Sequence, residues 1–453
     1  MVNFKNIVYI ISLISFFLCL FQEGNPKYPY LFVLPISLLL LSIIFFKIYE
    51  LLKNSIVFNI FIIQAIVRYC IVPYKMASGD FMRVGFQSLN GNTAVFLMVL
   101  EIIFAFISLQ ILANKQSKTY INRTKTVTVL NNSILIYCLI IGLFGLIYVS
   151  GHLAKVNFIW DLEAYVQEYI VDNEELHDSG LAAILFTPFK VIVALFLISR
   201  VYLSKISYNK KKYFYIIILI LASLFIVGTS RLSILQFVFP LLVLVSLILD
   251  RKSAKQLITT TAIALIPVIF ITSIAKFSRG DTQASSEDIF STSSMNAYFA
   301  GPGNVATGID AYEKLSLKNN SLFLINDMFQ NAPGFSKYTL DAYKTNVIFN
   351  NEIYGSNASR DQIVPLSISG IFHFGFLGGF VYVPLFLMVA LYMERKAYKE
   401  RFLGYKYVFI SLSITLSMVF MLNIGSFYFS IFSNILFIYL PLYLIKKFQL
   451  LKK

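Results

Sequence analysis

The sequence predicts an all-α membrane protein with about twelve transmembrane helices and one large extracytoplasmic loop. Three observations lead to this fold class. Of 453 residues, 58% are hydrophobic and only 13% are charged, whereas soluble domains are roughly half apolar and about a quarter charged. The apolar residues occur in runs of about 20, the length of helix that crosses a bilayer. Basic residues fall between these runs in a regular alternation.

Twelve apolar runs are candidate membrane spans. The first resembles a secretory signal peptide, but no small-residue cleavage site follows it, so we interpret it as an uncleaved helix. The run at 363–393 is too long for one straight crossing, and we expect it to begin with a re-entrant or tilted piece. The spans are 6–22, 28–48, 55–73, 92–114, 131–151, 181–203, 213–229, 232–249, 256–276, 363–393, 405–422 and 427–446.

The basic residues predict the orientation of these spans. If the N-terminus is cytoplasmic and the spans alternate, every inner loop carries Lys or Arg, as Lys210, Lys211 and Lys212 illustrate. Such an excess of positive charge is typical of cytoplasmic loops. Both termini are then cytoplasmic. The same distribution explains most of the net charge of +15 without a nucleic acid partner.

Two connections on the outer side are long enough to carry function. The loop at 152–180 is acidic, and the loop at 277–362 is the longest in the chain. Long loops are usually functional or disordered. The loop at 277–362 is rich in Phe and Tyr, which disordered segments lack. We therefore expect a single membrane domain over 1–453 with this loop folded against it.

A four-residue turn separates two of the predicted spans, in the stretch FIVGTSRLSILQF at 225–237. It leaves Arg231 on the outer face, beside the N-terminus of the descending helix. Free N–H groups and the helix dipole favour anions there, and a guanidinium binds two phosphate oxygens at once. The alternative is that Arg231 only anchors the turn to lipid head groups.

Two further arginines lie on the same side of the membrane. Arg279 follows the span at 256–276, and Arg360 precedes the span at 363–393. Because arginine is depleted outside the membrane, the three arginines together predict a clamp for a diphosphate. Arg360 has the alternative of a salt bridge with Asp361 or Glu352.

Arg68, Glu101 and Lys190 are charged residues that lie inside predicted spans. Ionisable groups in a membrane are costly and usually face a cavity or one another. The sequence leaves two interpretations open. Glu101 forms a structural ion pair with Arg68 or Lys190, or these residues contact a substrate.

Four short motifs carry a resemblance to a known family. They are GTSR at 228–231, FSRGD at 277–281, YFAGPGN at 298–304 and SRDQIVPLSISGIFHFGFLGG at 359–379. Together with the spans and the large outer loop, they resemble the Wzy-type polymerases, which join lipid-linked oligosaccharide repeat units into O-antigen or capsular polysaccharide. Members of that family have ten to fourteen spans and one large outer loop, so the resemblance covers the whole chain in architecture.

The resemblance implies an enzyme of the bacterial cytoplasmic membrane that transfers glycosyl groups on its outer face. The donor would be a growing chain on undecaprenyl diphosphate, and the acceptor a sugar hydroxyl on a lipid-linked repeat unit. Arg231, Arg279 and Arg360 would stabilise the leaving diphosphate without metal or cofactor. Partners would be both substrates, membrane lipid and a protein that regulates chain length. Candidates for the proton-accepting base are Asp361, Glu352, Asp281 and His373.

The substrate-binding candidates under this resemblance lie in the motif at 298–304 and inside the spans. The motif contributes Tyr298 and Asn304. The spans contribute the charged residues Arg68, Glu101 and Lys190.

The related O-antigen ligases carry a histidine upstream of a G-x-x-G element. Gly375 and Gly378 fit the glycine part, but Val364 stands where the ligase histidine would be. His373 lies only two residues before the glycines. This departure disfavours a ligase, and the alternative for His373 is a packed, hydrogen-bonded histidine without a chemical role.

Three other functions remain as alternatives: a flippase for the same lipid-linked unit, a ligase, and a membrane sensor or scaffold. Flippases have two similar halves and short loops, and no repeat is visible in this sequence. A sensor would not require three outer arginines. The chain has no P-loop, zinc-ligand spacing or Asp-x-Asp motif, which disfavours a nucleotide-sugar transferase.

Overall fold

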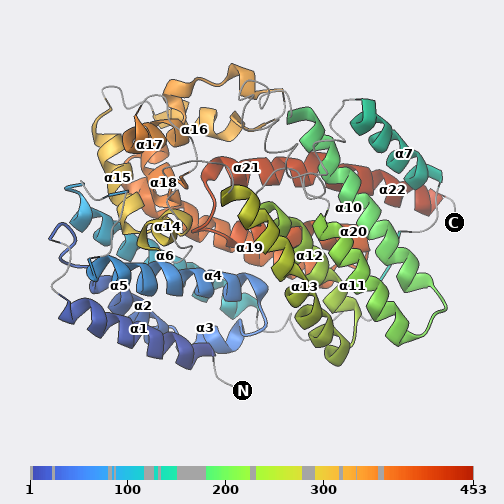
Figure 1. The fold of residues 1–453 in the computed structure, drawn as a ribbon, viewed down its shortest axis with the longest axis horizontal. Coiled ribbons are helices and arrows are strands. Elements are labelled where there is room, and N and C mark those ends of the chain that lie inside the picture. Colours follow the sequence, from blue (N-terminus) through green and yellow to red (C-terminus); the bar gives the residue numbers. More distant parts are fainter. Residues whose placement is uncertain are drawn as a thin grey trace. The chain divides into compact units, whose positions relative to one another are not determined.

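The computed structural model is helical over the residues that it describes (Figure 1). It describes residues 4–22, 26–79, 84–85, 88–116, 127–130, 134–149, 180–224, 231–277, 291–315, 320–332, 334–355 and 362–451. Within these ranges the one extended pairing is an isolated bridge between Thr128 and Phe402. The all-α fold class predicted from the sequence is therefore confirmed for the part of the chain that the structure describes.

The chain forms two compact units. Unit 1 comprises Met1–Ile121, Glu287–Arg395 and Ser413–Ser430, and unit 2 comprises Asn122–Ser286, Lys396–Leu412 and Ile431–Lys453. Each unit thus combines stretches that are far apart in the sequence. The expectation of a single membrane domain concerns how the chain lies in a bilayer, and it stays a prediction.

Unit 1 begins with closely packed N-terminal helices. α1 (Phe4–Phe21) lies against α2 (Val33–Ile44), and α2 lies against α6 (Gly91–Gln116). The remaining N-terminal elements are α3 (Phe46–Leu51), α4 (Ile56–Ile66), the π-helix η1 (Val67–Ile71) and α5 (Val72–Ala77).

The second part of unit 1 comes from the predicted outer loop and the apolar run that follows it. Its loop elements are α14 (Thr292–Tyr298), α15 (Pro302–Glu313), α16 (Asn320–Phe329), the short 3-10 turns η3 (Ser336–Tyr338) and η4 (Asp341–Tyr343), and α17 (Thr345–Tyr354). α16 and α15 both pack on α18 (Leu366–Phe374), as Figure 1 shows. The described part of the loop is therefore folded, as the aromatic content predicted. The acidic loop, at 152–179, lies outside the described residues.

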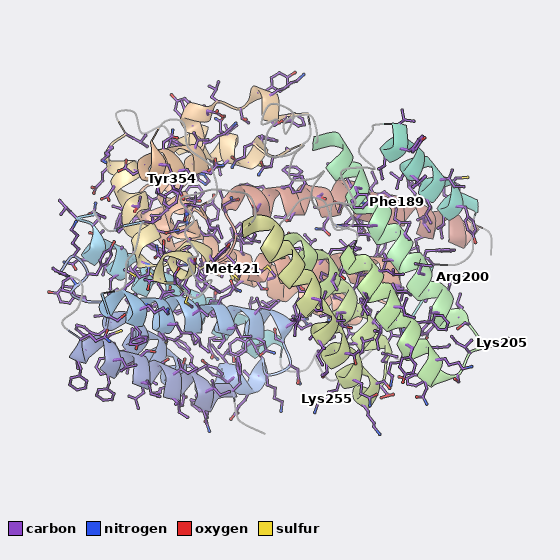
Figure 2. All side chains as sticks on the ribbon, in the orientation of Figure 1. Phe189, Arg200, Lys205, Lys255, Tyr354 and Met421 are labelled. Atoms are coloured by element: carbon purple, nitrogen blue, oxygen red, sulfur yellow. The ribbon has the colours of Figure 1, made fainter. Side chains whose placement is uncertain are left out.

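Unit 2 contains a group of antiparallel apolar helices (Figure 1). Its helices are α7 (Ile134–Val149), α10 (Gly180–Leu203), α11 (Tyr208–Leu224), α12 (Arg231–Ile248), α13 (Arg251–Phe277), the π-helix η6 (Ser433–Tyr439) and α22 (Leu440–Leu451). Figure 2 shows Arg200, Lys205 and Lys255 toward one end of α10–α13. One end of this helix group is thus basic. α20 (Leu403–Ser417) contributes residues to both units.

Six helices are long and apolar enough to cross a membrane, as in a membrane-embedded protein. They are Phe4–Phe21, Ile56–Ala77, Gly91–Asn114, Phe186–Leu203, Phe376–Lys399 and Ile424–Phe448. Three shorter apolar helices are Val33–Ile44, Ile136–Val149 and Gln236–Ile248. A helix occupies each of the twelve predicted runs, but only these six, within the described residues, meet the length and apolarity of a span.

The long run at 363–393 is interrupted, as expected from its length. α18 ends at Gly375, which has φ +74° and so turns the chain, and the 3-10 turn η5 (Phe376–Phe380) follows before α19 (Tyr382–Lys399). A Cβ atom on Gly370 would lie 2.1 Å from the carbonyl oxygen of Gly378. The two glycines therefore allow the backbones of α18 and η5 to touch. Whether this segment is re-entrant or tilted in a membrane stays a prediction.

Candidate functional site

A chain of four polar side chains lies in unit 1, around the predicted candidate His373. Nε2 of His373 lies 2.9 Å from Oδ2 of Asp327, and Nδ1 lies 2.6 Å from the hydroxyl oxygen of Tyr382. The hydroxyl of Tyr382 in turn lies 3.3 Å from that of Tyr428. We call these four residues the Asp-His-Tyr-Tyr chain. It brings together α16, α18, α19 and α21 (Ile424–Phe432).

Asp327 is a buried carboxylate, with none of its surface exposed. Its Oδ1 accepts hydrogen bonds from the backbone N–H of Thr345, at 3.0 Å, and from Nε2 of Gln330, at 3.2 Å. Thr345 is the first residue of α17, where N–H groups are free and the helix dipole favours a negative charge. The N-terminus of α17 therefore supplies a hydrogen bond to the carboxyl group of Asp327.

A carboxylate at Asp327 would determine which tautomer of a neutral His373 fits these two contacts. Because a carboxylate can only accept hydrogen bonds, Nε2 of a neutral His373 would carry the proton and donate a hydrogen bond to Asp327. Nδ1 then has a free lone pair, which accepts the hydrogen bond from Tyr382. This is the arrangement by which an acidic residue orients a histidine to take up a proton.

Aromatic packing positions the acidic Asp327 and the basic His373 relative to each other. Phe323 and Asp327 are four residues apart in α16 and so share one face of that helix. The ring of Phe323 meets that of Phe372, next to His373, edge-on at 5.0 Å between centroids. Phe323 is 1% exposed. The same face of α16 thus contributes both the hydrophobic contact and the carboxylate.

A second aromatic stack sets the position of the tyrosines. The ring of Tyr382 stacks on Phe386 at 5.6 Å, and Phe386 stacks on Phe427 at 4.5 Å. Phe427 directly precedes Tyr428 in α21. The stack therefore fixes α19 against α21 at the point where the two hydroxyl groups meet.

The glycines of the segment at 359–379 have roles in the fold. Gly375 supplies the positive φ of the turn, and Gly378 allows the contact with Gly370. A Cβ atom on Gly379 would lie 2.6 Å from the side chain of Leu97 in α6. These contacts explain the glycine pattern through backbone packing, next to the histidine that they position.

Arg68 and Glu101 form a fully buried ion pair, with Nη2 2.9 Å from Oε2. This is one of the two pairings that the sequence left open. The hydroxyl of Tyr69 donates to the same oxygen at 3.1 Å, and the guanidinium of Arg68 lies over the ring of Phe420 at 4.3 Å. Nε and Nη1 of Arg68 have no hydrogen-bond partner among the described residues. Among the described residues, no hydrogen bond or ion pair joins Arg68 or Glu101 to the Asp-His-Tyr-Tyr chain.

Lys190 belongs to unit 2 and lies between two aromatic rings. Its ammonium group is 5.6 Å from the ring centroid of Phe186 and 4.4 Å from that of Phe237. Such cation–π contacts stabilise a cation among apolar side chains. This environment explains how α10 accommodates a lysine without requiring Glu101.

The two predicted substrate-binding residues of the motif at 298–304 differ in exposure. Asn304 is fully buried and its amide is used within the fold, because Oδ1 accepts from Asn296 at 2.8 Å and Nδ2 donates to the carbonyl of Ile363 at 3.1 Å. Tyr298 is 39% exposed at the end of α14. The structure therefore gives Asn304 a structural role and leaves Tyr298 accessible.

The predicted arginine clamp lies largely outside the described residues. Arg279, Arg360 and Asp361 are not among them. α12 begins at Arg231, in agreement with the predicted start of the descending helix. The structure does not describe the side chain of Arg231. Among the described residues, no group of three or more His, Cys, Asp and Glu side chains could hold a metal ion.

No model of a known family, no curated protein and no solved structure matches the chain. The geometry of the described residues is therefore the basis on which its function is inferred.

Proposed function

We propose that this protein is a membrane glycosyltransferase that joins lipid-diphosphate-linked oligosaccharide repeat units into a surface polysaccharide. The observation that carries the proposal is the Asp-His-Tyr-Tyr chain, where a folded outer loop meets the apolar hairpin of α18 and η5. The resemblance to Wzy-type polymerases in the motifs at 228–231 and 359–379 supports the same activity.

The reaction requires one proton acceptor and one group that stabilises a leaving anion. The oxygen of the acceptor hydroxyl forms a bond to the anomeric carbon of the donor, and the bond from that carbon to the diphosphate oxygen breaks. The hydroxyl proton passes to His373, whose positive charge Asp327 stabilises. The lipid diphosphate departs as an anion, for which Arg231, Arg279 and Arg360 are the proposed partners.

The proposed topology has about twelve spans and both termini in the cytoplasm of a bacterial cell. The six long apolar helices and the three shorter ones support this count in part. The basic end of α10–α13 supports the orientation, since positive charge is typical of the cytoplasmic side. The loop at 277–362 and its helices then lie outside, where a lipid-linked unit is exposed after export.

A strain that lacks the gene tests the proposal. We expect single repeat units on the lipid, exposed on the outer face, and restoration of long chains by the wild-type gene. Single units trapped inside would indicate a flippase, long chains left on the lipid would indicate a ligase, and an unchanged profile would indicate a sensor or an unrelated transporter. Each of these three outcomes would overturn the proposal.

A further inference from the structure

In the Asp-His-Tyr-Tyr chain, the members differ in their access to the exterior. Asp327, His373 and Tyr382 are all buried, with exposed fractions of 4% or less. Tyr428 is only partly buried. Both ring nitrogens of His373 are already engaged, by Asp327 and by Tyr382. In this arrangement a proton from outside reaches His373 through the tyrosine hydroxyls.

Two amide side chains approach the face of α21 that carries Gly425 and Tyr428. Gly425 lies three residues before Tyr428 and so shares its face of α21. A Cβ atom on Gly425 would lie 2.5 Å from Nε2 of Gln330 and 3.0 Å from Nδ2 of Asn331. The amide side chains of Gln330 and Asn331, which directly follow α16, therefore lie against this face of α21. Asn331 is exposed.

We infer that Tyr428 is the residue that receives the proton of the acceptor hydroxyl, and that the Asn331 amide binds the sugar that carries this hydroxyl. The inference rests on the proposed function and names the acceptor side of its site. Amide groups both donate and accept hydrogen bonds, which suits them to the hydroxyls of a sugar.

The transfer balances as a series of proton shifts along existing hydrogen bonds. The acceptor hydroxyl gives its proton to the oxygen of Tyr428 while Tyr428 gives its own to the oxygen of Tyr382. Tyr382 gives its proton to Nδ1 of His373, which becomes an imidazolium beside Asp327. Both phenols end neutral, and the acceptor oxygen forms the new bond to the anomeric carbon. The 3.3 Å link between the tyrosines is long for a hydroxyl pair, as is common in sites without substrate.

The experiment measures chain extension by membrane vesicles that contain the full-length protein, with lipid-linked repeat units extracted from the deletion strain. Tyr428→Phe and Tyr382→Phe each remove one hydroxyl and keep the ring, so packing is retained. We expect each to lower kcat by about 10²-fold, the lower end of the usual effect of proton transfer, while the amount of folded protein stays constant. Tyr392→Phe, on the exposed side of α19, is the control and should keep the wild-type rate.

A second variant separates sugar binding from proton transfer. We expect Asn331→Ala to raise KM for the acceptor with kcat unchanged. If the wild type extends chains and His373→Ala does not, but both Tyr→Phe variants keep the wild-type kcat, the relay is overturned while the proposed function stands. An unchanged KM in Asn331→Ala would overturn the role of the amide. If the wild type itself extends no chains, the proposed function fails.

Discussion

Asp327 and His373 are 46 residues apart in the sequence and 2.9 Å apart in the structure. One comes from α16 and the other from the end of α18. Asp327 is held by the N-terminus of α17 and His373 by the glycine hairpin. Each residue thus has supporting contacts besides the one between them, which is typical of a preorganised site.

Substitution Asp327→Asn tests the role of the carboxylate. The amide oxygen of Asn can still accept the N–H of Thr345, so α17 keeps its cap, but the negative charge that stabilises a protonated His373 is lost. We expect polymer synthesis to fall by roughly 10²- to 10⁴-fold, with little change in melting temperature in detergent. Normal polymer from well-expressed Asp327→Asn protein would contradict the proposed role of the Asp327 carboxylate in stabilising a protonated His373.

The Arg68–Glu101 pair makes a prediction about stability. Removal of one partner leaves a buried charge unpaired, which costs about 3–5 kcal/mol. We expect Glu101→Gln and Arg68→Met each to lower the melting temperature of the purified protein, and the combined Arg68→Met, Glu101→Leu variant to recover much of the loss. If the combined variant is less stable than either single variant, the claim that Arg68 and Glu101 mainly neutralise each other's charge is contradicted.

Phe323 should dominate the attachment of α16 to α18. Phe323→Ala removes the buried contact with Phe372, and such truncations cost about 3–5 kcal/mol. Ile325→Ala is the control on the same helix, because Ile325 is 51% exposed and its truncation should change stability by only about 0.5 kcal/mol. Hydrogen exchange across 320–329 measures the effect, and equal protection of this segment in the two variants would contradict the packing described for α16.

Two glycine substitutions should act in opposite directions. In Gly370→Ala, the new methyl group would meet the carbonyl of Gly378, and neither backbone can move without opening the hairpin. In Gly142→Ala, the methyl group meets nothing within 4 Å, and alanine favours a helix interior by about 0.5–1 kcal/mol over glycine. Thermal unfolding in detergent distinguishes them. A Gly370→Ala protein as stable as the wild type would refute the close contact.

Much of the fold could be predicted from the sequence because runs of apolar residues identify membrane helices locally. The twelve apolar runs each contain a helix, and the interruption of the run at 363–393 followed from its length alone. The number of true spans is harder to predict. Helices such as α2 and α20 are apolar but shorter than the runs that suggested them, since apolar side chains also line the interior of each unit.

The site was only partly predictable. His373 and the Arg68–Glu101 pairing were among the sequence candidates because a histidine beside glycines and charges inside apolar runs are visible locally. Asp327, Tyr382 and Tyr428 were missed. Asp327 stands in an ordinary amphipathic helix, and only tertiary packing brings it to His373. An aspartate four residues after a phenylalanine was the one local signal, and this spacing is common in helices of any function.

The measurement that tests the central claim most directly is chain extension by the purified protein in liposomes. The only other component is the lipid-diphosphate-linked repeat unit extracted from the deletion strain. We predict a ladder of products, each longer by one repeat unit, with release of lipid diphosphate, and its loss in His373→Ala. If the purified wild-type protein leaves the single unit unchanged, or if His373→Ala forms the same ladder, the account is contradicted.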